Sequence, residues 1–304
     1  MNSNDKLITK DVVLVLNKKT NQDNSEKNAF IFDTAGSIGA AIGTALISGA
    51  SIVASPVAAV SFLGLSLGAK ILASRGKGKT QELNKRIQDI QLVSPNDLQT
   101  AIELDGIKLR NVNSIAEGLV LVKHPFLPNT YINIDSMEED LLNLKLDCLS
   151  SIMQDLGATS LKGHANLIEM KERTIDAKFR IEYKTIKIDP SVKKEQKEKY
   201  ESSYIIEDSY NGEFNKESYI RAKEQAAKFG LDKDIAIQIL MEQRNPDRPR
   251  KLMSRKRTIE LTRELNKTLD IALPLSISGI ALAPSYNGLF SSCKTIKFEF
   301  DVQF

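Results

Sequence analysis

The chain contains no tryptophan, and only two cysteines and two histidines occur among its 304 residues. Cys148 and Cys293 lie far apart and form no CxxC pair, which indicates a reducing compartment and predicts no disulfide framework. His124 and His164 each lack a second histidine or cysteine at metal-ligand spacing, so we expect no zinc site. Because GxSxG, HExxH and Cys/His signatures are also missing, we expect no enzymatic activity and no cofactor.

Net charge is small as well, at +3 with 27% charged residues, which is too little by itself to indicate a nucleic-acid-binding protein. The apolar stretch 12–16 is too short for a secretory signal, and no small-residue cleavage site follows it. We therefore expect a cytoplasmic protein. Its length predicts two domains, or one domain with an appended element.

An uncharged block of Gly, Ala, Ser and aliphatic residues spans 34–69. Ser55-Pro56 divides the block into two arms, each near the ~17–25 residues that cross a bilayer. Proline lacks an amide hydrogen and disfavours helix at the residue before it, so we expect two helices joined by a turn. Small residues four apart let helix backbones approach closely. The residues predicted to form this helical hairpin and its oligomerisation surface are Gly36, Gly39, Gly43, Gly49, Pro56, Gly64 and Gly68.

Lysines flank both ends of the block, and the positive-inside rule would then keep both ends in the cytoplasm. Serine and threonine dilute the two arms, however, and no Trp or Tyr belt marks a membrane interface. Two interpretations stay open. The block contacts the inner face of the cell membrane, or it forms a buried Gly/Ala helix pair in the core of a soluble oligomer.

Residues 73–80, ASRGKGKT, fit a permissive Walker A pattern in which Lys79 would hold phosphates and Thr80 would hold Mg²⁺. A phosphate-binding loop follows a buried parallel strand, whereas the Gly/Ala block precedes this one. No later apolar strand ends in a suitable aspartate. We therefore interpret this segment, with Lys77 and Lys79, as a basic, glycine-flexible exit from the hairpin.

The densest cationic stretch is Arg248, Arg250, Lys251, Arg255, Lys256 and Arg257. Each cation contributes ~1 kcal/mol near an anionic lipid surface, so lipid headgroups or the acidic face of a partner are the favoured ligands. The other interpretation is a solvated loop and helix start without a ligand. Nucleic acid is disfavoured because no aromatic residues are interleaved for base stacking.

Residues 81–135 are predicted to form a small mixed α/β region. Ser94 before Pro95 indicates a helix start, since proline is tolerated in the first turn. Short strands are expected at 107–109, 119–123 and 131–134. Residues 1–33 are predicted to form a short strand and a polar linker, and 34–80 to form the hairpin.

Residues 136–304 are predicted to form an α+β domain with an antiparallel sheet of two hairpins and a helical segment between them. A capping box of Ser136 and Glu139 opens a helix that ends near Leu156. Period-two alternation predicts strands at 161–170, 175–183, 269–277 and 296–304, with a KERT turn at 171–174. Helices are expected at 191–207, 217–230, 232–244 and 255–267.

These parts together favour a non-enzymatic, membrane-active, self-assembling protein, and by analogy a bacterial pore-forming or antiviral defence effector. Its expected partners are further copies of itself and an anionic membrane. The alternative is a soluble homo-oligomeric assembly protein. An enzyme or nucleotide-binding protein with an unmarked site is the third hypothesis.

Overall fold

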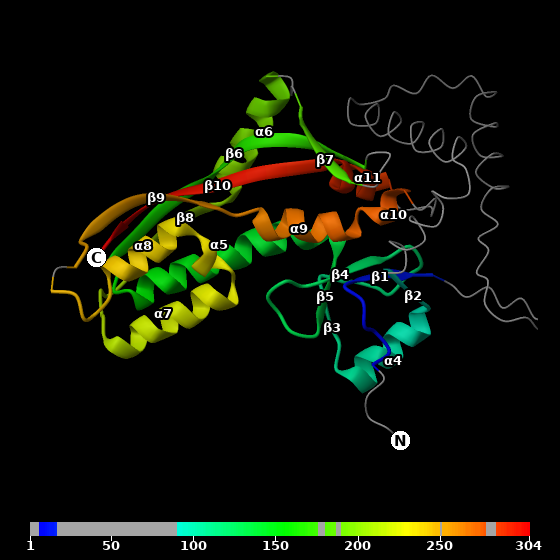
Figure 1. Ribbon diagram of the computed structural model, residues 1–304, viewed down its shortest axis with the longest axis horizontal. Helices are drawn as coiled ribbons and strands as arrows, with labels where there is room; N and C mark the ends of the chain where they lie inside the picture. Colours follow the sequence, from blue (N-terminus) through cyan, green and yellow to red (C-terminus); the bar gives the residue numbers. More distant parts are fainter. Residues whose placement is uncertain (1–5, 17–89, 176–179, 187–189, 250, 278–283) are drawn as a thin grey trace, which may run out of the picture.

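The computed structural model describes residues 6–16, 90–175, 180–186, 190–249, 251–277 and 284–304. Over these residues the chain is mixed α+β and contains two five-stranded sheets (Figure 1). The predicted hairpin with Gly36, Gly39, Gly43, Gly49, Pro56, Gly64 and Gly68 lies outside the described residues, as do Lys77, Lys79 and Arg250.

Sheet A has the strand order β2-β1-β4-β5-β3. Its strands are β1 (Val12–Val15), β2 (Ile90–Val93), β3 (Lys108–Arg110), β4 (Val120–Lys123) and β5 (Thr130–Asn133). The outer pairs β1/β2 and β3/β5 are parallel, and the other pairs are antiparallel. This confirms the predicted strands of the mixed region.

Helix α4 (Pro95–Asp105) packs on one face of sheet A, where Leu98 and Ala101 are buried with Val13 and Leu121. Ser94 caps it as expected, because its hydroxyl accepts from the Asp97 amide at 3.1 Å. The Asp97 carboxylate accepts in return from the Ser94 amide at 3.4 Å, which completes a capping box.

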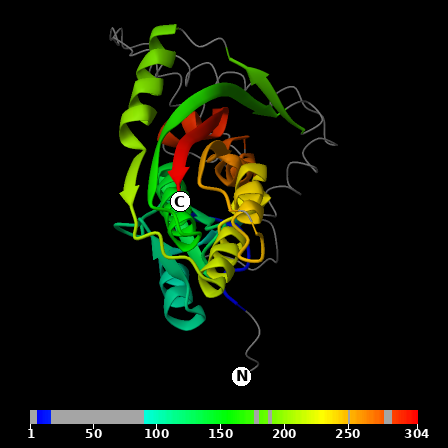
Figure 2. The same cartoon turned by 90° about the vertical axis from the view of Figure 1, so that its left-hand side faces the viewer.

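Sheet B follows the order β7-β6-β10-β9, and β8 lies beside β6. Its strands are β6 (Ser160–Ile175), β7 (Ile181–Thr185), β8 (Ile205–Ser209), β9 (Ser254–Glu260) and β10 (Ser292–Gln303). All pairs are antiparallel, as predicted. Figures 1 and 2 show β6 and β10 arching over α5 (Met137–Asp155), with α7 (Lys216–Lys228) and α8 (Ile235–Gln243) on the same side.

Three of the remaining helices in the described ranges join the two sheets. α9 (Arg263–Ala272), α10 (Pro274–Ile277) and α11 (Pro284–Ser291) cover the second face of sheet A, where Leu269 and Phe290 are buried with Leu14 and Ile132. The predicted regions 81–135 and 136–304 therefore share this core. α6 (Pro190–Ser203) packs against β6, and single turns of 3-10 helix lie at Ile134–Ser136 and Leu231–Lys233.

Two element types were predicted wrongly near the C-terminus. Residues 269–277 form the end of α9 and α10 instead of a strand, because Leu265, Leu269 and Ala272 recur at helical spacing and all three are buried. Residues 255–260 form β9 instead of a helix. An edge strand tolerates consecutive cations because one side of it meets water.

Other boundaries also differ from the prediction. KERT continues β6 instead of turning, because Arg173 is anchored to backbone carbonyls of the neighbouring segment. The helix expected at 191–207 ends at Ser203, and β8 follows it. Ser136 forms no side-chain cap, since a 3-10 turn leads directly into α5. Helices α7 and α8 are confirmed.

Candidate functional site

The cationic stretch occupies the loop after α8 and the strand β9. Arg248 is exposed and its Nη2 lies 2.5 Å from Glu242 Oε1. Strand alternation divides the next cations between two faces of sheet B. Arg255 and Arg257 pair with the buried residues Val302 and Phe300, so they lie on the inner face toward α8.

Lys256 lies on the opposite, outer face of sheet B. Its side chain is 85% exposed, and its Nζ lies 3.8 Å from Asp301 Oδ2. Lys251 lies over the ring of Phe214, with Nζ 4.8 Å from the ring centroid. The structure therefore separates the predicted anionic-surface residues, and among those that it describes Arg248, Lys251 and Lys256 are exposed.

Four charged residues cross the outer face of sheet B in one row. The strand register places Glu207 of β8 beside Lys162 of β6, Lys162 beside Asp301 of β10, and Asp301 beside Lys256 of β9. Charge alternates in sign along this row, which we call the charge row. It lines an open hollow of about 750 Å³ on this face.

The charge row suits surface recognition. Opposed residues on neighbouring strands lie close enough to interact, and each opposite-charge pair contributes ~0.2–1 kcal/mol. In water such pairs stabilise a fold little, but they fix register and select partners. Sequence reasoning missed this row because its residues come from four separate segments and only the strand register brings them together.

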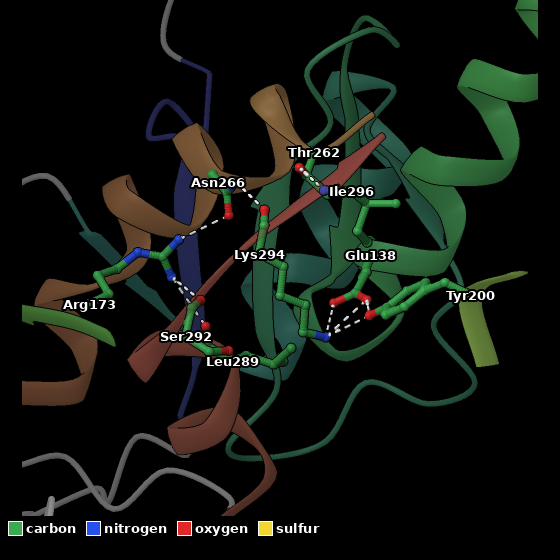
Figure 3. A network of polar contacts seen from close by, with 9 residues as sticks. All are labelled: Glu138, Arg173, Tyr200, Thr262, Asn266, Leu289, Ser292, Lys294 and Ile296. Carbon is green, nitrogen blue, oxygen red and sulfur yellow. Dashed lines mark hydrogen bonds and ion pairs between the residues drawn. The ribbon is translucent and has the colours of Figure 1, made fainter. Parts of the chain in front are cut away.

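A polar network attaches α6 to sheet B (Figure 3). Lys294 Nζ donates to both carboxylate oxygens of Glu138, at 2.8 and 3.0 Å, and to the Tyr200 hydroxyl at 2.9 Å. The Tyr200 hydroxyl donates in turn to Glu138. Burial, together with the Glu138 charge, raises the pKa of Tyr200. The hydroxyl therefore keeps its proton, and the network positions a helix.

The same view shows Arg173 holding the end of α11. Its Nη1 donates to the carbonyl oxygens of Leu289, Phe290 and Ser292 at 3.2, 3.3 and 3.0 Å. Its Nε lies 2.8 Å from Asp270 Oδ1. Carbonyls at a helix C-terminus lack partners within the helix, so this buried guanidinium stabilises the helix end.

Two further ionisable pairs are buried among the described residues. His124 Nε2 lies 3.2 Å from Asp140 Oδ2, and Lys145 Nζ is paired with Glu264. Burial lowers the pKa of both His124 and Lys145, while their carboxylate partners act against that effect. His124 and Lys145 are only 3% and 2% exposed, so each pair joins packed elements with little room for a substrate.

Asn111, Asn113 and Asn133 are among the residues that line a second hollow, of about 470 Å³, together with Tyr286 of α11. Asn111 also donates to Asp140 Oδ1 at 3.2 Å. Among the described residues no group of three or more His, Cys, Asp and Glu side chains is placed to hold a metal ion. Burial raises the pKa of Cys148 to about 12, so this thiol is unreactive.

Comparison of the chain with protein-family models, curated proteins and solved structures finds no match. None of the helices in the described ranges is long and apolar enough to span a bilayer.

Proposed function

We propose that this protein is a non-enzymatic, membrane-active protein that self-assembles, and that the Gly/Ala block 34–69 is the part that meets the bilayer. The connection between β1 and β2 carries the proposal. These adjacent parallel strands pair from Val12 with Ile90 to Val15 with Val93. A connection of 74 residues, 16–89, joins them. A parallel crossover needs only about a dozen residues, so roughly 60 residues exceed what sheet A requires.

Both ends of this connection are fixed to one small sheet. The chain leaves β1 after Val15, which pairs with Val93, and it enters β2 at Ile90, which pairs with Val12. These two points are three residues apart along the strand direction, which is only about 10 Å. The lateral spacing of two strands adds only about 4.8 Å. These separations are small beside the ~30 Å of a bilayer core. An apolar block bracketed in this way suits a hairpin that returns to the side it left.

The charges around the block support the same orientation. Lys18 and Lys19 precede the block, and Lys70, Lys77 and Lys79 follow it. Cations on both flanks favour a hairpin whose two ends stay on the cytoplasmic side, where the folded body would also lie. The glycines at four-residue spacing then permit close packing between copies within the bilayer.

The alternative is a soluble homo-oligomer that buries the block at its centre. The two functions predict different distributions of the protein between the membrane pellet and the supernatant. We expect the full-length protein to sediment with membranes and to resist both high salt and alkaline carbonate. Release by salt alone would indicate contact through cations, and a high-mass species in the supernatant would favour the alternative.

A matched pair of variants tests the role of the block. Ile47→Asp with Leu65→Asp places one carboxylate in each arm, at a cost of about 2.5–3.5 kcal/mol per charge in a bilayer centre. We expect alkaline carbonate to release this variant from the membrane pellet. Asn21→Asp with Asn24→Asp adds the same charge to the polar linker and should stay in the pellet. Equal partitioning of the two variants would contradict the proposal.

A further inference from the structure

Among the residues that the structure describes, sheet B ends in an unpaired strand on each side of the charge row. Within the described ranges β9 pairs only with β10, and β8 pairs only with β6, so the local order is β8-β6-β10-β9. An edge strand presents backbone N–H and C=O groups that a further strand can bind. The two edges of this sheet differ in charge.

Over residues 254–258 the outer edge of β9 has no strand partner in the described part of the chain. The Phe304 amide donates to the Met253 carbonyl at 2.8 Å, and the Leu261 amide donates to the Ile296 carbonyl at 2.9 Å. Odd-numbered residues of β9 therefore direct their backbone groups toward β10, and Ser254, Lys256 and Thr258 direct theirs outward. All three are exposed. Further along, the Glu260 amide donates to Asp234 at 3.4 Å, which ends the open stretch.

The β8 edge is open in the same way. The Ala165 amide donates to the Tyr204 carbonyl at 3.0 Å, and the Tyr210 amide donates to the Thr159 carbonyl at 2.9 Å. Even-numbered residues of β8 therefore bond to β6. The exposed residues that direct their backbone groups outward are Ile205, Glu207 and Ser209.

We propose that the folded bodies assemble edge to edge, with β9 of one copy pairing with β8 of a second copy so that sheet B continues across the interface. β8 is antiparallel to β9 within one copy, because each neighbouring pair between them is antiparallel. A second copy in a similar orientation therefore offers an antiparallel strand. This inference rests on the proposed self-assembly and names its surface.

One register satisfies the charges on both faces of the sheet. Lys256 lies opposite Glu207 of the second copy on the outer face, and Arg255 lies opposite Asp208 on the inner face. The same register places Ser254 opposite Ser209, and Thr258 and Arg257 opposite Ile205 and Ile206. The Nε atoms of Arg255 and Arg257 are buried and have no hydrogen-bond partner within the described part of the chain. The Asp208 carboxylate of the second copy, which already accepts from the Ser150 and Tyr210 hydroxyls, supplies negative charge opposite Arg255.

The charge row points to the same pairing. Within one copy it runs Glu207, Lys162, Asp301, Lys256, and Glu207 of the next copy continues the alternation. Pairing β9 with another β9 would instead oppose the cations 255–257 to each other, and pairing β8 with β8 would oppose Glu207 and Asp208. The contact is therefore heterologous, which produces a ring or an open chain of copies.

The interface is short, because β8 has only five residues. A ladder of this length is weak in dilute solution. Copies gathered on one membrane gain effective concentration, and the pairing then becomes populated. The test below is therefore carried out on full-length protein bound to vesicles of phosphatidylglycerol and phosphatidylcholine.

Mixed cysteine crosslinking tests the register while leaving every charge in place. Ser254→Cys and Ser209→Cys are made in separate chains with Cys293→Ser as background. Within one copy these residues are about three strand spacings apart, roughly 14 Å, which is too far for a disulfide. We expect oxidation to give a crosslinked dimer in the mixture and not in either variant alone. Ser202→Cys on α6, mixed with Ser254→Cys, is the negative control.

Charge exchange tests the recognition. Lys256→Glu in the Ser254→Cys chain should lower the yield of mixed dimer at least about fivefold. Glu207→Lys in the Ser209→Cys chain should then restore it. The inference would be overturned if the Ser254→Cys chain alone formed crosslinked dimers. It would also be overturned if the mixture with Ser209→Cys gave no more dimer than the mixture with Ser202→Cys. If the protein sediments in a carbonate-resistant form but gives no mixed crosslinks, the edge pairing is wrong and the proposed function is unaffected. If mixed crosslinks form but the protein does not sediment with membranes, the edge pairing is supported and the membrane function is contradicted.

Discussion

The guanidinium group of Arg244 lies against the ring of Phe304, 4.3 Å from its centroid, and the ring of Phe214 lies 4.8 Å away. Its Nε and Nη1 donate to the carbonyl oxygens of Leu156 and Leu252, at 3.0 and 2.9 Å. Arg244 is only 6% exposed. Aromatic faces and carbonyl groups thus hold this buried cation. It connects the end of α5 with the segment before β9 and with the residue that follows β10.

Replacing Arg244 with Met should lower the free energy of unfolding by about 2–3 kcal/mol. Met keeps the aliphatic volume but removes two charged hydrogen bonds and the contacts with both rings. Arg248→Met is the matched control, because its exposed pair with Glu242 contributes at most about 1 kcal/mol. Urea denaturation measures both variants. Similar losses for the two variants would show that neither the ring contacts nor the two carbonyl hydrogen bonds of Arg244 stabilise the fold.

His124 makes stability depend on pH. Its Nδ1 accepts from the amides of Phe126 and Leu127, both at 3.1 Å, so the ring proton sits on Nε2, toward Asp140. Burial lowers the pKa of His124 below 6.5 despite the opposing effect of Asp140. The unfolded state therefore binds the proton first. The contribution of His124 is present above pH 6.5 and is lost as the pH falls toward the lower, folded pKa.

His124→Gln should remove this dependence. The difference in unfolding free energy between wild type and variant should shrink as the pH is lowered from about 7.5 to about 5, by at most about 1.4 kcal/mol per pH unit. If the His124→Gln curve kept the wild-type slope, a carboxylate and not this imidazole would be responsible.

Gly163 lets β6 and β10 approach each other. A Cβ atom there would lie 2.6 Å from the Glu299 carbonyl oxygen and 2.7 Å from the Phe298 ring. Since backbone cannot move aside cheaply, Gly163→Ala should cost about 2–3 kcal/mol. His164→Ala, at the next and exposed position, should cost no more than about 0.5 kcal/mol. Thermal unfolding of the two variants gives the comparison, and equal midpoints would mean that the strands separate freely.

Local sequence signals predicted the elements that depend on local physics. Ser94 with Pro95 located the start of α4, and the helix predicted to end near Leu156 is α5, which ends at Asp155. Alternation at 296–304 located most of β10. Each signal lies within one element, so no knowledge of the partner was needed.

Misassigned elements depended on partners distant in sequence. The alternating Leu and Ile residues at 269–277 satisfy both a strand and part of a helix, and burial against sheet A selects the helix. The cations of β9 resemble a helix face until pairing with β10 makes them an edge strand. The charge row could not be predicted from the sequence for the same reason. It exists only once four strands are in register.

The loop cations Arg250 and Lys251 should contribute most to contact with an anionic membrane. Arg248 is already paired with Glu242, and Arg255 and Arg257 lie on the inner face of sheet B, so fewer cations are available than the sequence suggests. Arg250→Gln with Lys251→Gln should weaken binding to anionic vesicles several-fold, at about 1 kcal/mol per cation.

A charge-matched control separates this local effect from a general loss of positive charge. Lys194→Gln with Lys197→Gln removes the same charge from α6, where both lysines lie within 4 Å of a glutamate one turn away, at 3.8 and 3.4 Å. This control should bind vesicles nearly as the wild type does. Raising the salt toward 1 M, where the Debye length is ~3 Å, should abolish the difference between the variants. A difference that persists at high salt would mean that the loop inserts apolar atoms, and its cations would then have no electrostatic role.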